Sequence, residues 1–263
     1  MQGPVRGPDG LFHMIWVWRD TPDCATNHHL SYARSKDLIH WESAFGDKVN
    51  LRLTISEKAL WIDPIPSGGG IINGGSRLSF DKDDRPIVTY HKSDKDGNMQ
   101  IYVARADNDK WVRHQLTDWD KPVKFGGNGT MEFIGIGISE LTQAEDGLLT
   151  MTYRHRDYGS GRLVIDEETL RSIDKKVTIT KEQYPKALNQ LQSDFKGMGI
   201  QRSKDIGDSG DENVRYILQW ETLGTNRDRP RKSPLPQPSA LKLYKLRANI
   251  ETGTVNKELK ATR

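Results

Sequence analysis

The sequence is poor in cysteine, in long apolar runs and in net charge. Cys24 is the single cysteine among 263 residues, so no disulfide and no cysteine-based metal site can form within one chain. No apolar run approaches the ~18–20 residues of a membrane-spanning helix. The formal net charge is only +3, which mildly favours a polyanionic ligand and does not indicate nucleic acid. We therefore expect neither a membrane nor a nucleic acid as a partner.

A repeated pattern of turn, strand and aromatic residue runs through the chain. It occurs at residues 9–20, 83–94, 146–157 and 212–223. The aligned aromatic residues are Trp16, Tyr90, Tyr153 and Trp220, which are 74, 63 and 67 residues apart. Strand-rich units at such regular spacing are typical of β-propeller blades. We interpret these segments as the second strands of consecutive blades.

Neighbouring segments supply the other strands of each blade. Third strands are predicted at 28–35, 99–106, 162–168 and 240–246, first strands at 72–80, 131–141 and 198–203, and a fourth strand at 110–117. The first repeat shows no first strand, so the chain is expected to begin inside a blade.

The predicted fold is therefore all-β, a partial β-propeller of about three and a half four-stranded blades. It forms a single domain over residues 1–263, with blade remnants at about 9–46, 70–118, 130–177 and 196–252. The missing blades would precede this chain or come from a partner chain. A complete four-bladed propeller is the alternative.

Titratable residues gather where second strands end and third strands begin, which is a face where propellers usually bind ligands. Four of the seven histidines lie there, together with tyrosines and arginines. Such a cluster is expected of an active site, although solvated or turn-capping side chains would give the same pattern. His28 and His29 alternate in direction along a strand, so they are not expected to share one pocket. Zinc bound by His28, His91 and His155 is a further alternative, but no short ligand spacing supports it.

The loop at 226–238 of the last repeat is rich in arginine and proline. Its arginines, among them Arg227 and Arg229, can hold carboxylates or sulfates in bidentate fashion. The alternative is a solvated basic loop that proline stiffens.

Several runs resemble a known group of propellers. Residues 35–41, SKDLIHW, resemble the Asp box of sialidase-like propellers, although its central Gly and its Thr are absent. The runs NHHLSYARSKDLIHWE, VTYHKSDKDGNMQIYVARA and QWETLGTNRDRPR resemble the neuraminidase-repeat (BNR) propellers among polysaccharide lyases. That group includes ulvan lyases, and lyases and rhamnosidases that act on rhamnosyl-glucuronate linkages. The resemblance covers most of residues 9–246.

The resemblance implies a seven-bladed ring and β-elimination at a uronic acid of an anionic polysaccharide. Its catalytic residues would be His28, Tyr90, His91 and Arg154. Arginine would neutralise the uronate carboxylate, and His or Tyr would act as base and acid. Substrate-binding residues would be His29, Lys92, Tyr153, His155, Arg227 and Arg229. No cofactor is required, a structural Ca²⁺ is allowed, and the full-length protein is expected to be secreted or periplasmic.

Two other functions compete with the lyase. A glycoside hydrolase, such as an α-L-rhamnosidase, usually needs two opposed carboxylates. The predicted face offers Glu221 and Glu132 but no pair, which ranks the lyase first. A non-catalytic carbohydrate-binding propeller is the third hypothesis.

Overall fold

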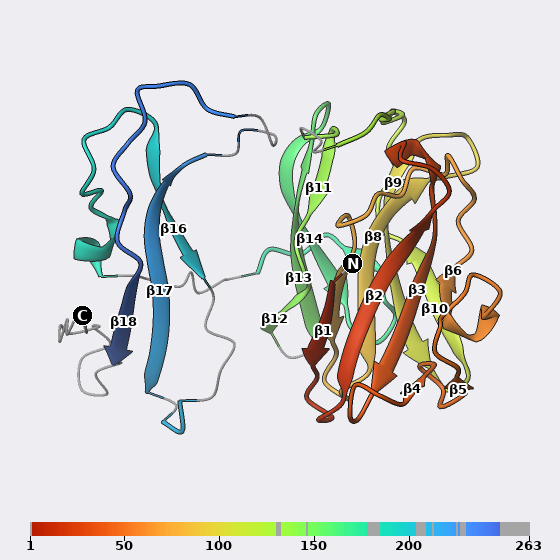
Figure 1. Ribbon diagram of the computed structural model, residues 1–263. Coiled ribbons are helices and arrows are strands. Elements are labelled where there is room, and N and C mark those ends of the chain that lie inside the picture. Colours follow the sequence, from red (N-terminus) through yellow and green to blue (C-terminus); the bar gives the residue numbers. More distant parts are fainter. Residues whose placement is uncertain are drawn as a thin grey trace. The chain divides into compact units, whose positions relative to one another are not determined.

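The computed structural model describes residues 2–129, 133–145, 147–177, 185–203, 209–211, 213–224, 226 and 230–247. In these residues the fold is all-β. Short 3-10 turns lie at η1 (Cys24–Thr26), η2 (Lys58–Leu60) and η3 (Lys186–Asn189), and the strands form four antiparallel sheets (Figure 1). Within the described part of the chain, no helix has the length and hydrophobicity to cross a membrane. The chain divides into two compact units, Met1–Ile179 and Thr180–Arg263.

The first unit contains three of the sheets. The first has the order β1 (Gln2–Arg6), β2 (Phe12–Arg19), β3 (Asn27–Ser35), β4 (Trp41–Glu42) and β5 (Lys48–Val49), and β6 (Trp61–Asp63) also pairs with β3. The second has the order β7 (Arg77–Phe80), β8 (Pro86–Ser93), β9 (Met99–Asp107) and β10 (Lys110–Gln115). The third has the order β11 (Ile136–Ile138), β13 (Leu148–His155), β14 (Gly159–Asp166) and β15 (Ser172–Ile173), and β12 (Thr142–Glu145) also pairs with β13.

The second unit holds the fourth sheet. Its order is β16 (Met198–Ser203), β17 (Val214–Leu223) and β18 (Lys242–Arg247). Leu188, Ile217 and Leu246 form a small core of their own on this sheet.

The strand repeat predicted from the sequence is confirmed. The four aligned segments contain β2, β8, β13 and β17, and each of these strands has antiparallel partners on both sides. Sheets of three to six strands therefore recur along the described chain. The closed ring, the number of blades and the single domain remain predictions.

The prediction that the first repeat lacks a first strand is wrong. Gln2–Arg6 forms β1, which pairs antiparallel with β2 along an edge of the first sheet. Gly3 and Pro4 hide this strand in the sequence, because both residues are depleted in strands. An edge strand tolerates Pro, since its N–H group is not needed for the ladder. Gly3 fits for a second reason: a Cβ there would lie 2.4 Å from the His13 carbonyl oxygen.

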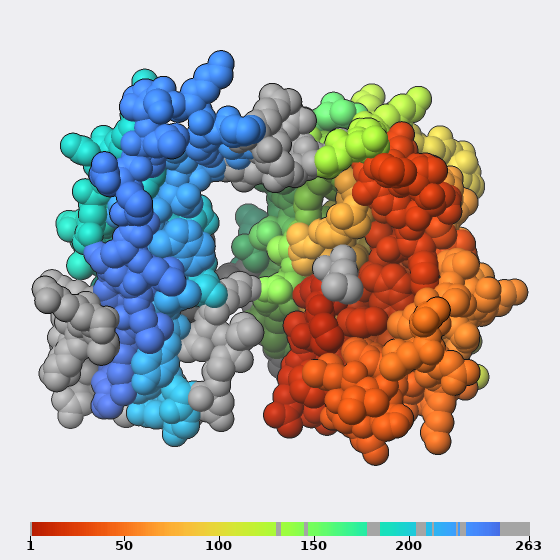
Figure 2. All heavy atoms as spheres, in the orientation of Figure 1, coloured from red at the N-terminus to blue at the C-terminus, as the bar shows by residue number. Residues whose placement is uncertain are grey.

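The three sheets of the first unit pack in sequence order. Ile15, Leu30 and Tyr32 of the first sheet contact Val88 and Tyr90 of the second in one buried cluster. On its other face the second sheet contributes side chains such as Ile87, Met99 and Ile101, which pack on Leu149, Met151 and Ile165 of the third. The alternating side chains of β8 are thus buried on both faces, as expected of a sheet that packs between two others. In Figure 2 the red and orange residues of β1–β5 form one continuous part of this unit's surface.

Candidate functional site

The loops that follow β2, β8 and β13 meet at one end of the first unit, which we call the loop end. The backbone N–H of Cys24 donates to the Gly127 carbonyl at 2.9 Å, and that of Gly68 donates to the Ala25 carbonyl at 3.0 Å. A guanidinium nitrogen of Arg156 donates to the Pro122 carbonyl at 3.1 Å. The backbone N–H of Ser93, at the end of β8, donates to the Gly69 carbonyl at 2.9 Å. These contacts bring the ends of β2, β8 and β13 to one region, at the top of Figure 1.

His28 and His29 lie together at the start of β3. Their Nδ1 atoms are 2.8 Å apart, and their rings meet edge to face with centroids 4.9 Å apart. His28 Nε2 lies 3.1 Å from the Asp20 carboxylate, and the His29 ring packs on Trp61. Burial, followed by the neighbouring His28, lowers the pKa of His29.

The expectation that these two histidines alternate in direction is wrong, for a backbone reason. His29 has a φ of +41°, in the left-handed region, and the pairing of β2 with β3 shifts register between Val17 and Trp18. A residue in that conformation breaks the two-residue alternation of a strand. The result is a contiguous imidazole pair next to a carboxylate.

The Asp63 carboxylate, whose charge also acts on His29, binds three polar side chains. It accepts hydrogen bonds from the Tyr90 hydroxyl at 2.6 Å, from Lys92 Nζ at 2.6 Å and from Arg113 at 2.9 Å. Tyr90 is fully buried, and burial together with the Asp63 charge raises its pKa well above the usual value. Tyr90 therefore keeps its proton, and Lys92 is held in an ion pair.

His91 is buried and neutral. Its Nδ1 lies 2.9 Å from the Gly70 carbonyl, which can only accept, so Nδ1 carries the proton and Nε2 keeps a lone pair. Burial lowers the pKa of His91 to about 4. Gly75 covers the ring so closely that a Cβ there would lie 2.5 Å from Nε2.

Arg154 lies in an open pocket with two further arginines, which we call the arginine pocket. The pocket has a volume of about 770 Å³ and includes Arg77, Arg154 and Arg162 with Phe133 and Tyr153. The Arg154 guanidinium lies 4.3 Å from the centre of the Phe133 ring, a cation–π contact. None of the described residues that line it is an aspartate or a glutamate. The pocket thus offers positive charge beside aromatic surface.

A chain of contacts connects the histidine pair with the arginine pocket. The Asn27 amide, next to His28, donates to the Cys24 carbonyl at 2.7 Å and approaches the Asn73 side-chain oxygen at 3.4 Å. The neighbouring Gly74 carbonyl accepts a hydrogen bond from Arg77 at 2.6 Å. Residues 72–75 therefore lie between the two groups.

His155 and Tyr153 pack into the third sheet. Their rings contact Trp119, with centroid distances of 4.6 and 5.3 Å. His155 is almost completely buried, its Nδ1 accepts from the backbone N–H groups of Asp157 and Tyr158, and burial lowers its pKa. Its Nε2 has no hydrogen-bond partner among the described residues.

The predicted residues thus divide into surface and interior groups. Arg154 is exposed at the arginine pocket and His28 is partly exposed, whereas Tyr90, His91 and His155 are buried. Arg227 and Arg229 lie outside the described residues. Within the described ranges, no group of three His, Cys, Asp or Glu side chains is placed to hold a metal ion.

The sequence analysis missed Asp63, Arg77, Arg113 and Phe133. Arg77 begins β7, within the segment 72–80 that was predicted as a first strand, so its place at a strand start could have indicated it. Asp63 gave no such signal, because β6 belongs to no repeat unit.

Comparison with known proteins adds a family match over part of the chain. Residues 1–119 match the model of a BNR repeat-containing family. No curated protein matches the sequence.

Similar solved structures include carbohydrate-processing enzymes. An ulvan lyase, a polysaccharide lyase bound to -[GlcA(1-4)Rha3S]-, is 10% identical with a TM-score of 0.41, over 89% of this chain and 51% of that one. A fructan 1-exohydrolase IIa from Cichorium intybus is 13% identical with a TM-score of 0.36, over 90% of this chain and 49% of that one. A xylan beta-1,4-xylosidase from Bacillus halodurans C-125 is 16% identical with a TM-score of 0.32, over 88% and 39%.

The chain thus spans about half the length of the ulvan lyase. The resemblance to BNR-repeat proteins inferred from the sequence is confirmed, and it is residues 1–119 that match the BNR repeat-containing family.

Proposed function

We propose that this chain is part of a carbohydrate-active enzyme that binds an anionic polysaccharide at the loop end and cleaves it by β-elimination. The arginine pocket is the observation that carries the proposal. Three guanidinium groups beside aromatic rings suit a carboxylated sugar, because arginine pairs with carboxylates in bidentate fashion and rings stack on sugar faces. A rhamnose–glucuronate linkage is the substrate that the sequence resemblance favours.

The solvent exposure of the predicted residues suggests a role for each of them. Arg154, exposed in the pocket, would neutralise the uronate carboxylate and stabilise the charge that develops there when the C5 proton leaves. His28, partly exposed and paired with Asp20, would transfer protons. Tyr90 and His91 are buried, so we assign them first to holding Asp63 and residues 70–75 in place. A direct catalytic role for these two remains a prediction.

A glycoside hydrolase on the same linkage is the second candidate. The carboxylate pair that most such enzymes use is missing from the described lining of the arginine pocket. Asp63 is already bound by Tyr90, Lys92 and Arg113. Asp20 lies beside His28, and a single carboxylate does not complete a pair. A non-catalytic carbohydrate-binding protein is the third candidate.

Product analysis separates the three candidates. The chain is incubated with a glucuronate-containing polysaccharide, and both ultraviolet absorbance and new reducing ends are followed. A lyase forms an unsaturated uronate, so both signals rise together. New reducing ends without absorbance identify a hydrolase, and retention of the chain on the polysaccharide without either signal identifies a binder.

A further inference from the structure

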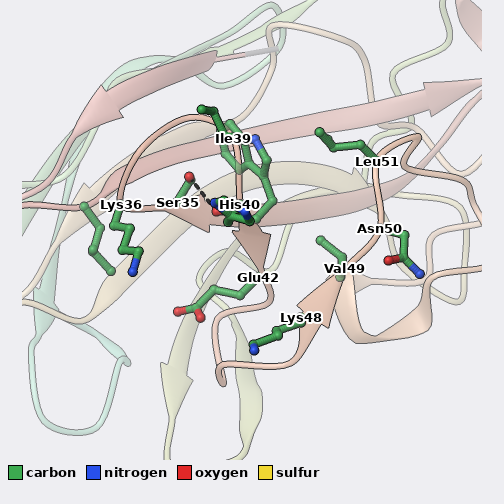
Figure 3. Close-up of a pocket in the computed structure, with 11 residues that line it drawn as sticks. Ser35, Lys36, Ile39, His40, Glu42, Lys48, Val49, Asn50 and Leu51 are labelled. Atoms are coloured by element: carbon green, nitrogen blue, oxygen red, sulfur yellow. Dashed lines mark hydrogen bonds between the residues drawn. The ribbon is translucent and has the colours of Figure 1, made fainter.

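A second cavity lies at the opposite end of the first sheet, where β3 finishes. It has a volume of about 680 Å³, within the range of ~300–1,000 Å³ that ligand pockets occupy. Its walls are the turn at residues 35–41 and the segment at residues 48–51 (Figure 3). We call it the turn pocket. It shares no lining residue with the arginine pocket.

The turn pocket has an apolar wall that is unusually open to solvent. Leu11, Trp41 and Val49 line it, and Ile39 and Leu51 stand at its opening with 63% and 64% of their surface exposed. Large apolar side chains grouped in this way at a cavity mark an interaction site more often than scattered ones do. An apolar body is therefore the first requirement of a ligand.

The charged residues of the turn pocket leave an excess of positive charge. Glu42 is held by Arg34 at 2.8 Å, and His40 is held by Asp37 at 2.8 Å. Lys36 and Lys48 also line the pocket, are exposed, and form no ion pair with any described residue. In Figure 3, Ile39 and Leu51 lie above these two lysines. A negative group is the second requirement.

The wall at residues 35–41 is held in place before any ligand arrives. The Asp37 carboxylate accepts the backbone N–H groups of Ile39 and His40 at 2.9 and 2.8 Å, and these bonds lower the pKa of Asp37. Ser35 Oγ donates to the His40 carbonyl at 2.6 Å, and the Trp41 indole donates to the Leu38 carbonyl at 3.2 Å. Preorganisation of this kind lowers the entropy lost on binding.

We propose that the turn pocket binds a small amphiphilic anion, an alkyl or aryl acid whose apolar body packs against Ile39, Trp41 and Leu51 while its acid group meets Lys36 and Lys48. Among the described residues at this pocket, the carboxylates are held in ion pairs and two lysines form none, which distinguishes this ligand from a neutral sugar. The site is independent of the polysaccharide function, because it lies at the far end of β3 from His28.

Two dyes of similar shape test the proposal on the whole chain. Anilinonaphthalene sulfonate is an amphiphilic anion, and phenylnaphthylamine is its neutral counterpart. Leu51→Asp removes apolar wall and adds negative charge, and it should weaken binding of the anionic dye by roughly tenfold or more, since burying a leucine side chain contributes ~1.5–3 kcal/mol. Leu241→Asp is the matched control, because Leu241 is also 64% exposed but lies in the second unit.

A second comparison tests whether the ligand must carry a negative group. Reversing the charge of both lysines, Lys36→Glu with Lys48→Glu, should weaken binding of the anionic dye by about three- to tenfold. The affinity for the neutral dye should change by no more than about twofold. If Leu51→Asp and Leu241→Asp lose the same affinity for the anionic dye, or if neither loses any, the proposal of a site here is overturned. Equal binding of the anionic dye before and after charge reversal overturns the ligand class. Neither result bears on the arginine pocket.

Discussion

The state of a single side chain, His91, follows from its burial. The ring is fully enclosed, its pKa falls from 6.5 to about 4, and the neutral form with a proton on Nδ1 is therefore present at neutral pH. In the unfolded chain the same ring takes up a proton near pH 6.5. Between these values the unfolded state binds more protons than the folded state, so stability decreases as pH falls.

We expect the free energy of unfolding to show this linkage. For the wild type it should decrease as pH is lowered from about 6.5 to about 4, with His91 contributing on the order of 3 kcal/mol of the change. His91→Gln should remove that part of the slope. Urea unfolding at a series of pH values gives the free energy of unfolding of both proteins. If this free energy depends on pH with the same slope in both, His91 does not cause the pH dependence.

At the same scale, the sequence predicted which strands carry the candidate residues better than how their side chains are oriented. His28, Tyr90, His91 and Arg154 occupy strand positions assigned from the repeat alone. The left-handed backbone of His29 was not predictable, because that conformation is uncommon for residues other than glycine. The burial of Tyr90 and His91 was also missed. It depends on β6, which belongs to no repeat, and on residues 70–75, which lie before β7 although a strand was predicted from residue 72.

At the scale of elements, close packing of the loop end depends on a glycine. Gly75 lies over His91, and an added methyl group would meet Nε2 at 2.5 Å and Ile72 Cγ2 at 2.9 Å. Residues 72–75 also connect the histidine pair with Arg77. The position of this segment therefore decides how the two halves of the site are spaced.

Gly75→Ala should accordingly destabilise the chain by roughly 1–3 kcal/mol through overpacking. Gly199→Ala is the control, because its Cβ would meet no atom closer than 4.0 Å. Chemical denaturation of both variants gives the comparison. If Gly199→Ala lowers the free energy of unfolding as much as Gly75→Ala does, the contact with His91 is not the cause of the destabilisation.

Strand prediction succeeded where the pattern was strong and failed where composition opposed it. The centres of β2, β8, β13 and β17 were found because apolar alternation and a terminal aromatic residue recur. β1 was missed because Gly3 and Pro4 argue against a strand, although an edge position tolerates them.

At the scale of the whole molecule, the described chain is a set of repeated antiparallel sheets. Three of them stack in order within Met1–Ile179, and each interface buries large apolar side chains. This arrangement places the loops after successive second strands at a common end, whatever the number of blades. Under the proposed function, a composite site would be built from several sheets, and His28 and Arg154 would serve one ligand although they lie far apart in the sequence.

Recognition of an anionic sugar at the arginine pocket is the central claim. Isothermal titration with a glucuronate oligosaccharide, and with a neutral oligosaccharide of equal length, tests it directly. The wild type should prefer the anionic ligand, and Arg154→Ala should bind it at least about tenfold more weakly, because hydrogen bonds to charged groups contribute ~1.5–3 kcal/mol. The affinity of Arg154→Lys for the anionic ligand should lie between those of the wild type and Arg154→Ala, since lysine keeps the charge and loses the planar fork.

Arg171→Ala is the control, because Arg171 is exposed in the same unit and does not line the pocket. It should bind as the wild type does, and circular dichroism should show all variants folded. Equal affinity of the wild type for the two oligosaccharides, or equal affinity of the wild type and Arg154→Ala for the anionic one, would contradict the account.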